Sequence, residues 1–148
     1  MEIYDSAVVE RFNNLRFRVE DIDCAPDSAE GLRVHVAMGD NALCGDTLTI
    51  AVSVAARDGR AVVQDVRYAG YGCSLCLATA DVLAEQVRGM GAHDAARLAL
   101  DDVKRMWGGL NVGRARRDCV DLPVRTLRQA LQGEYGEDGQ NDESRIDA

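Results

Sequence analysis

An alternation of apolar and polar residues, closed by an Asp-Gly turn, limits what this chain can fold into more than any other feature. Every second residue of segment 47–54 is a large aliphatic residue: Leu48, Ile50, Val52 and Val54. This period of two is typical of a strand with one buried face. Asp58-Gly59 follows, and both residue types tolerate the positive φ of a two-residue hairpin turn. Residues 61–69 are therefore predicted to return as a second strand, whose apolar face holds Val62, Val66 and Tyr68.

The flanking segments extend this hairpin into an α+β domain. Residues 32–36 alternate in the same way, which predicts another strand with His35 on its polar face and the apolar Leu32, Val34 and Val36 on the other. After Cys73 the apolar period changes to about 3.6 and predicts a long helix ending near Gly89.

A last helix is expected from Cys119, with Pro123 in its first turn. We also expect shorter helices at residues 5–16, 95–100 and 102–107, the last two with Asp94 and Asp101 as N-caps. The predicted architecture is a small three-stranded antiparallel sheet covered on one face by helices.

Length and charge fit one domain followed by a tail. The chain has 148 residues, of which 47% are hydrophobic, enough for a core. The net charge is -8, but residues 133–148 alone contain six acidic residues and one basic residue. We therefore expect a folded domain at residues 1–132 and a disordered acidic tail at residues 133–148. The domain lacks the basic footprint of a nucleic-acid-binding protein.

The N-terminal residues and the cysteine usage indicate a cytoplasmic protein. The sequence does not open with a basic stretch and an apolar run, and no segment is long and apolar enough to span a membrane. Thiols stay reduced in the cytoplasm, and this chain has five cysteines, an odd number. We interpret them as metal-binding or reactive thiols and not as a disulfide framework.

Three of the cysteines stand where predicted elements begin. Cys44 precedes the first hairpin strand, Cys73 precedes a helix and Cys119 precedes the last helix, so we expect all three to converge at one end of the domain. Asp46 follows Cys44 by two positions, and an extended backbone places both side chains on one face. Three thiolates and a carboxylate form a four-ligand site in which the oxygen is the weakest donor for a soft metal.

The surroundings of these thiols favour the charged form. A thiolate is both the metal ligand and the nucleophile of sulfur transfer. Cys73 and Cys119 are predicted at helix N-termini, where unpaired amide groups and the helix dipole favour an anion. Near Cys119 the positive charges of Arg114, Arg116 and Arg117 act in the same direction.

In order and spacing, residues 5–132 resemble the U-type iron–sulfur cluster assembly proteins: the scaffold IscU, its relative SufU and the N-terminal family of NifU. Three segments carry the resemblance: Leu43-Cys44-Gly45-Asp46-Thr47, Gly70-Tyr71-Gly72-Cys73-Ser74 and Cys119-Val120-Asp121-Leu122-Pro123. The resemblance implies a SufE/NifU-like fold and a site for Zn²⁺ or a [2Fe–2S] cluster, formed by Cys44, Asp46, Cys73 and Cys119. It also implies that Cys44 accepts a persulfide, with Arg116 in support.

The chain combines features of both branches. IscU-type proteins have a histidine before the third cysteine, where this chain has Asp118, and a Leu-Pro-Pro-Val-Lys chaperone-binding segment that is absent here. SufU-type proteins have an arginine three residues before that cysteine, which Arg116 matches, but they also have an insertion that this chain lacks.

Several neighbouring residues have two interpretations. Cys76 follows Cys73 by one helical turn and is either an extra ligand or a core residue, of which the core is favoured. Asp118 is either a replacement ligand or a solvated carboxylate, and Cys24 is interpreted as a bystander. One group of arginines forms either a solvated helix face or a docking surface for an acidic partner: Arg114, Arg116, Arg117, Arg125 and Arg128.

Three functions are compatible with these residues. The first is a scaffold that accepts sulfur from a cysteine desulfurase, builds a [2Fe–2S] cluster and passes it to apo-proteins. The second is a SufU-like, zinc-dependent sulfurtransferase that relays persulfide to another scaffold, which would make the chain an enzyme. The third is a regulatory partner of the desulfurase with a purely structural metal. We expect a monomer or a weak homo-oligomer in each case.

Overall fold

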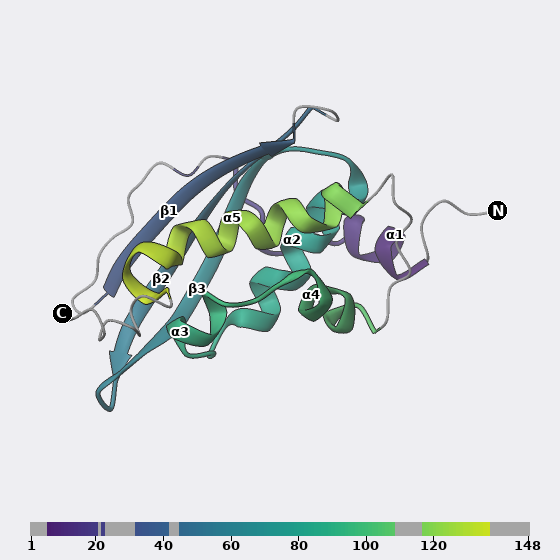
Figure 1. The fold of residues 1–148 in the computed structure, drawn as a ribbon. Coiled ribbons are helices and arrows are strands. Elements are labelled where there is room, and N and C mark those ends of the chain that lie inside the picture. Colours follow the sequence, from purple (N-terminus) through teal and green to yellow (C-terminus); the bar gives the residue numbers. More distant parts are fainter. Residues whose placement is uncertain (1–5, 21, 23–31, 42–44, 109–116, 137–148) are drawn as a thin grey trace.

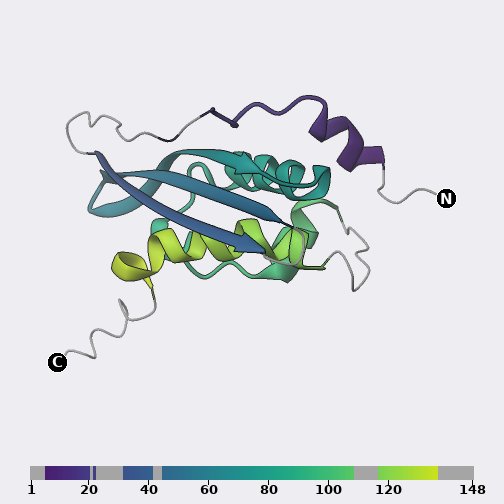
Figure 2. The same ribbon diagram turned by 90° about the horizontal axis from the view of Figure 1, so that it is seen from above.

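The structure is a computed structural model that describes residues 6–20, 22, 32–41, 45–108 and 117–136 (Figure 1). Its elements are α1 (Ser6–Phe12), β1 (Leu32–Asn41), β2 (Asp46–Arg57), β3 (Arg60–Tyr71), α2 (Ser74–Val87), α3 (Ala92–Ala95), α4 (Leu100–Met106) and α5 (Arg117–Tyr135). The strands form one antiparallel sheet in the order β1-β2-β3. Helix α5 packs on β1 and β2, α2 packs on β3, and α1 packs on α2 (Figures 1 and 2). This is the predicted α+β architecture.

The predicted hairpin is confirmed, with one change of phase. Asp58 and Gly59 have φ of 53° and 78°, as a two-residue turn of this type requires. The four aliphatic residues of β2 are all buried: Leu48, Ile50, Val52 and Val54. On β3 the register shifts by one residue at Gln64, and this bulge turns Val63 to the core in place of Val62. The expectation for Val62 is wrong because a period of two does not reveal a bulge.

Strand β1 faces the helices with small and polar residues, contrary to prediction. The register places five residues opposite the buried face of β2: Arg33, His35, Ala37, Gly39 and Asn41. Val36, expected to point inward, is 51% exposed. Gly39 supplies the reason, because a Cβ there would lie 2.4 Å from Thr126 Oγ1 of α5. The helix lies so close to β1 that a valine has no room beneath it.

Helix α2 is central and is buried on nearly all sides. It contacts β3, α1, α4 and α5, so its expected single apolar stripe understates its burial. Gln86, near the C-terminal end of the helix, is exposed. A helix enclosed in this way must satisfy its own polar side chains, and α2 carries Asp81, which is 0% exposed.

A network of hydrogen bonds satisfies Asp81. Its Oδ1 accepts hydrogen bonds from the backbone N–H groups of Arg16 (3.0 Å) and Phe17 (2.8 Å) and from the Tyr68 hydroxyl (2.9 Å). Its Oδ2 accepts one from Arg11 Nε at 2.8 Å. Burial, and then the charge of Asp81, raises the pKa of Tyr68, so the hydroxyl remains a donor. The network attaches the N-terminal segment to the core.

Both short helices differ from prediction: the one expected at residues 95–100 lies instead at Ala92–Ala95, and the one expected at residues 102–107 begins at Leu100. Asp94 and Asp101 lie inside α3 and α4, whose N-caps are Gly91 and Ala99. In α4 the Ala99 N–H donates instead to the carboxylate of Asp102 at 2.8 Å. This interaction satisfies the N–H of the N-cap residue, and the Asp102 N–H in turn donates to the Ala99 carbonyl at 3.0 Å.

Helix α5 begins earlier and ends later than predicted. It starts at Arg117, so Pro123 lies in its second turn and not in its first. It continues to Tyr135, beyond the expected domain end at residue 132. The remainder of the predicted tail, residues 137–148, lies outside the described residues. Within the described part of the chain, no helix has both the length and the apolarity to cross a membrane.

Candidate metal centre

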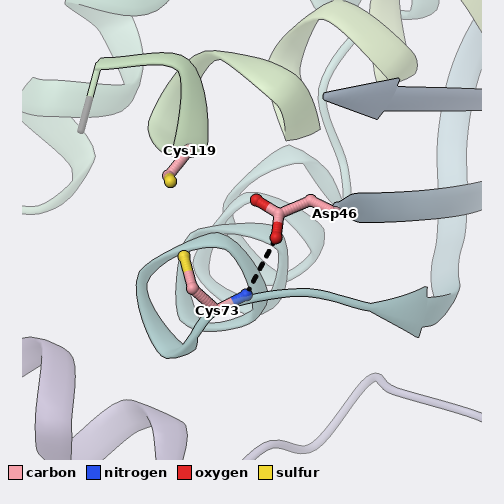
Figure 3. Close-up of side chains that lie close together, drawn as sticks. All are labelled: Asp46, Cys73 and Cys119. Atoms are coloured by element: carbon pink, nitrogen blue, oxygen red, sulfur yellow. Dashed lines mark hydrogen bonds between the residues drawn. The ribbon is translucent and has the colours of Figure 1, made fainter. Parts of the chain in front are cut away.

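Three residues from three elements bring metal-ligand atoms together at one end of the sheet (Figure 3). Asp46 begins β2, Cys73 is the N-cap of α2, and Cys119 lies in the first turn of α5. One carboxylate oxygen and the two sulfur atoms lie within 4.8 Å of one another. Ligands of a single tetrahedral ion, bound at about 2.3 Å, are roughly 4 Å apart, so a small inward shift is enough for them to share an ion.

Asp46 has one satisfied and one unsatisfied oxygen. The residue is 3% exposed, and its Oδ1 accepts a hydrogen bond from the Cys73 N–H at 3.2 Å. Its Oδ2 is buried and has no hydrogen-bond partner among the described residues. An unpaired buried carboxylate oxygen is costly, and a cation would remove that cost. Two thiolates and a carboxylate oxygen suit zinc or iron.

Glycines hold the connection between β3 and α2 close to Asp46. Gly70 has φ of 139°, and a Cβ there would lie 2.1 Å from a carbonyl oxygen of β2. At Gly72 a Cβ would lie 3.2 Å from Cys76 Sγ and 3.5 Å from Asp46 Cγ. The backbone therefore passes tightly between the sheet and α2, and this path presents Cys73 to Asp46.

The fourth predicted ligand, Cys44, lies outside the described residues. The same is true of Arg116 and Cys24. The residues that flank Cys44 are described: the Gly45 N–H donates to the Asn41 carbonyl at 2.8 Å, and Gly45 has φ of 76°. This hydrogen bond joins the end of β1 to the residue that precedes β2.

The two additional candidates are not part of this cluster, although Cys76 Sγ and Asp46 Cγ both lie within 3.5 Å of the Cβ position at Gly72. Cys76 is fully buried in the hydrophobic core, in line with the interpretation favoured from sequence. Asp118 is exposed on α5, as a solvated carboxylate would be. Among the described residues, only Asp46, Cys73 and Cys119 form a cluster of metal-ligand atoms.

Comparison with known proteins identifies the family. The family model described as NifU-like N terminal domain matches residues 3–139 of this chain. The chain belongs to this family. The NifU-like domain is 27% identical over 142 residues to iron-sulfur cluster assembly scaffold protein IscU 1 of Archaeoglobus fulgidus, a match that covers 95% of this chain and 82% of that protein. It is 28% identical over 104 residues to the IscU scaffold protein of Aquifex aeolicus, with 70% and 64% covered.

Solved structures share the fold. A NifU-like protein (N-terminal) from Brucella abortus superposes with a TM-score of 0.63 at 23% identity, covering 88% of this chain and 92% of that one. FiSufU from Fervidobacterium islandicum AW-1 gives a TM-score of 0.60 at 22% identity, with 87% and 96% covered. The predicted resemblance and the SufE/NifU-like fold are confirmed.

One polar residue of the NifU-like domain was missed by sequence reasoning. Asn41 is 7% exposed and pairs with Asp46 in the β1–β2 register. Its Nδ2 is buried and has no hydrogen-bond partner among the described residues. The sequence signal was present, since Asn41 precedes Cys44 by three positions, but it acquires meaning only once β1 is known to extend that far.

The two histidines of the domain lie near the other end of α5. His35 Nε2 is 3.2 Å from the Tyr135 hydroxyl, and the rings of His35 and His93 both meet Tyr135 edge-on, with centroids 5.2 and 5.5 Å away. The expectation that His35 lies on the polar face is wrong, for the same reason as for Val36. Burial lowers the pKa of His35 despite the nearby Glu134.

Proposed function

We propose that this NifU-like domain is a scaffold on which an iron–sulfur cluster is assembled. The observation that carries the proposal is the convergence of Asp46, Cys73 and Cys119, with a buried carboxylate oxygen that lacks a partner. Relatives named as iron–sulfur cluster assembly scaffolds support it. Cys44 is the proposed fourth ligand, because it stands two residues before Asp46 and two residues span at most about 7 Å.

The proposed first step is sulfur transfer to Cys44. Its thiolate attacks the outer sulfur of a persulfide on a cysteine desulfurase, so a new S–S bond forms and the desulfurase leaves as a thiolate. Arg116 is proposed to favour the thiolate of Cys44. Reducing each persulfide sulfur to sulfide requires two electrons. Iron(II) supplies part of these electrons as it is oxidised to iron(III), and an external electron donor supplies the rest. The completed [2Fe–2S] cluster is the cargo and passes to an apo-protein.

Asp46 is proposed to keep this cargo exchangeable. A carboxylate oxygen is a harder donor than a thiolate and binds iron in a sulfur-rich site less firmly. A site with one such ligand can release what it holds, whereas four thiolates would retain it. The same buried position also excludes water from the weak ligand until a partner arrives.

The variant Asp46→Ala tests this role. We expect slower cluster transfer to an apo-protein and a longer-lived cluster, both followed by the visible spectrum under anaerobic conditions. Asp118→Ala removes an exposed acid beside Cys119 and serves as the matched control, with both rates unchanged. Faster loss of the cluster from Asp46→Ala would contradict the proposal.

A zinc-dependent sulfurtransferase is the second candidate. Arg116 and the missing chaperone-binding segment favour it, and zinc accepts the same ligands. Incubation with a cysteine desulfurase, cysteine and iron separates the two functions. A visible chromophore without faster desulfurase turnover supports the scaffold, whereas strong stimulation with tightly bound zinc and no chromophore supports the transferase. If neither response is observed, a structural metal is the remaining interpretation.

A further inference from the structure

Asn41 lies on the helix-facing side of the sheet, at the end that holds the metal-ligand group. It is the last residue of β1 and pairs with Asp46, the first residue of β2. Paired residues of an antiparallel ladder point to the same face, with Cβ atoms about 5 Å apart. The side chain of Asn41 is therefore a direct neighbour of the Asp46 carboxylate.

The packing of α5 on β1 also brings Asn41 towards Cys119. His35 of β1 contacts Tyr135, and Gly39 lies against Thr126, so the two elements run in opposite directions. From Gly39 to Asn41 the strand advances about 6.6 Å, which corresponds to roughly 4.4 residues of helix. This distance along α5 leads from Thr126 to the second turn and from Leu122, which also lies against Gly39, to the first turn. Cys119 is in that turn.

Asn41 and Asp46 each present a buried polar atom without a partner among the described residues, Nδ2 on one and Oδ2 on the other. The two atoms have opposite requirements. Oδ2 is an acceptor that a cation satisfies, whereas an amide nitrogen has no available lone pair for a cation and needs an acceptor for its N–H. The metal-ligand group provides two types of acceptor, the Asp46 carboxylate and the cysteine sulfurs. Once a cation occupies Oδ2 of Asp46, the acceptor that remains for the Asn41 N–H is cysteine sulfur.

We propose that Asn41 donates a hydrogen bond from Nδ2 to a cysteine sulfur of the metal-loaded site and thereby positions that ligand. This inference rests on the proposed metal site at Asp46, Cys73 and Cys119, but not on the scaffold function. The N–H draws electron density from the thiolate and holds its direction. Groups that support metal ligands in this way commonly change metal affinity by about 10–100-fold.

Cobalt(II) binding tests the proposal, because thiolate-to-cobalt absorption reports on the sulfur ligands without any cluster. Asn41→Leu removes the donor at similar volume, and Asp40→Ala removes the exposed neighbouring side chain as control. We expect Asn41→Leu to weaken Co²⁺ binding about 10-fold and to move the charge-transfer band to longer wavelength. Asp40→Ala should change neither quantity.

Two further measurements separate positioning from folding. The metal-free Asn41→Leu variant should melt at the same temperature as the unaltered domain or higher, because an unpaired buried donor is lost. Asn41→Asp keeps an oxygen but has no N–H, so it should bind Co²⁺ no better than Asn41→Leu. A metal-free variant that is less stable and has unchanged Co²⁺ affinity would overturn the proposal, as would full affinity in Asn41→Asp.

The result is independent of cluster assembly. An unaltered domain that binds Co²⁺ through thiolates but builds no cluster would refute the scaffold and leave the role of Asn41 standing. An unaltered domain without thiolate-to-cobalt bands would overturn the metal site and the role of Asn41 with it. Cluster assembly with a Co²⁺ spectrum unchanged by Asn41→Leu would refute only the role of Asn41.

Discussion

Two buried aspartates of this domain differ in how completely their oxygens are satisfied. Asp81, in the central helix, has hydrogen bonds to both oxygens from four groups of the N-terminal segment and β3. Asp46, at the start of the central strand, has a single hydrogen bond and one oxygen without a partner among the described residues. The two residues are almost equally buried.

This difference in hydrogen bonding indicates the role of each aspartate. A fully hydrogen-bonded carboxylate has no capacity left for a ligand and serves the fold. A half-satisfied one is a cost to the fold that a bound cation can offset. Burial alone would not have separated the two residues, whereas counting the partners of each oxygen does.

The largest effect is expected from Asp81→Asn. The variant removes one of the two carboxylates that pair with Arg11 and places an amide NH2 group, which cannot accept, against hydrogen-bond donors. We therefore expect a loss of about 3 kcal/mol in the free energy of unfolding. Urea denaturation of the metal-free domain measures it. Glu85→Gln is the matched control on the same helix, since it removes the exposed partner of Arg11 and should cost less than about 1 kcal/mol. Equal losses in both variants would contradict the importance of the network.

Asp46→Asn should have a smaller effect on the same measurement. The amide oxygen still accepts from the Cys73 N–H, and the unpaired charge is gone, so the free energy of unfolding should change by no more than about 1 kcal/mol. Zinc binding, measured by competition with a chelator, should nevertheless weaken clearly. A destabilisation as large as that of Asp81→Asn would show that Asp46 is a structural acid.

The smallest effect concerns His35 at the far end of α5. Burial lowers its pKa below 6.5, so the folded state favours the neutral ring and the unfolded chain binds the extra proton first. The stability that depends on neutral His35 is present above pH 6.5 and is lost as the pH falls through the folded-state pKa. His35→Gln should therefore flatten the fall in unfolding free energy between pH 7 and 5. His93→Gln, which removes the other histidine that meets Tyr135, is the control variant.

The sequence predicted the elements of this fold better than their phases. Alternation and the Asp-Gly turn located β2 and β3, because local propensity decides them. Val36 and Val62 were assigned to the wrong face. The close contact of α5 at Gly39 and the bulge at Gln64 decide these positions, and both depend on residues far away in the chain.

The candidate site was predicted through its unusual residue types. Cysteines at element ends pointed to Cys73 and Cys119, and spacing pointed to Asp46. Asn41 was not found, because an asparagine before a turn is common and only the register places it opposite Asp46. Residues with distinctive chemistry can be recognised singly, whereas those that support them depend on geometry.

The contact at Gly39 has a consequence for anyone who wants to redesign the domain. Gly39 is two residues from the end of β1, yet its missing side chain sets how near α5 can approach the sheet. Cys119 belongs to that helix, whereas Asp46 belongs to β2 of the sheet. A larger residue at position 39 would therefore increase the distance between the Cys119 thiol and the Asp46 carboxylate. The size of the ion that the site prefers would change, although every ligand would be retained.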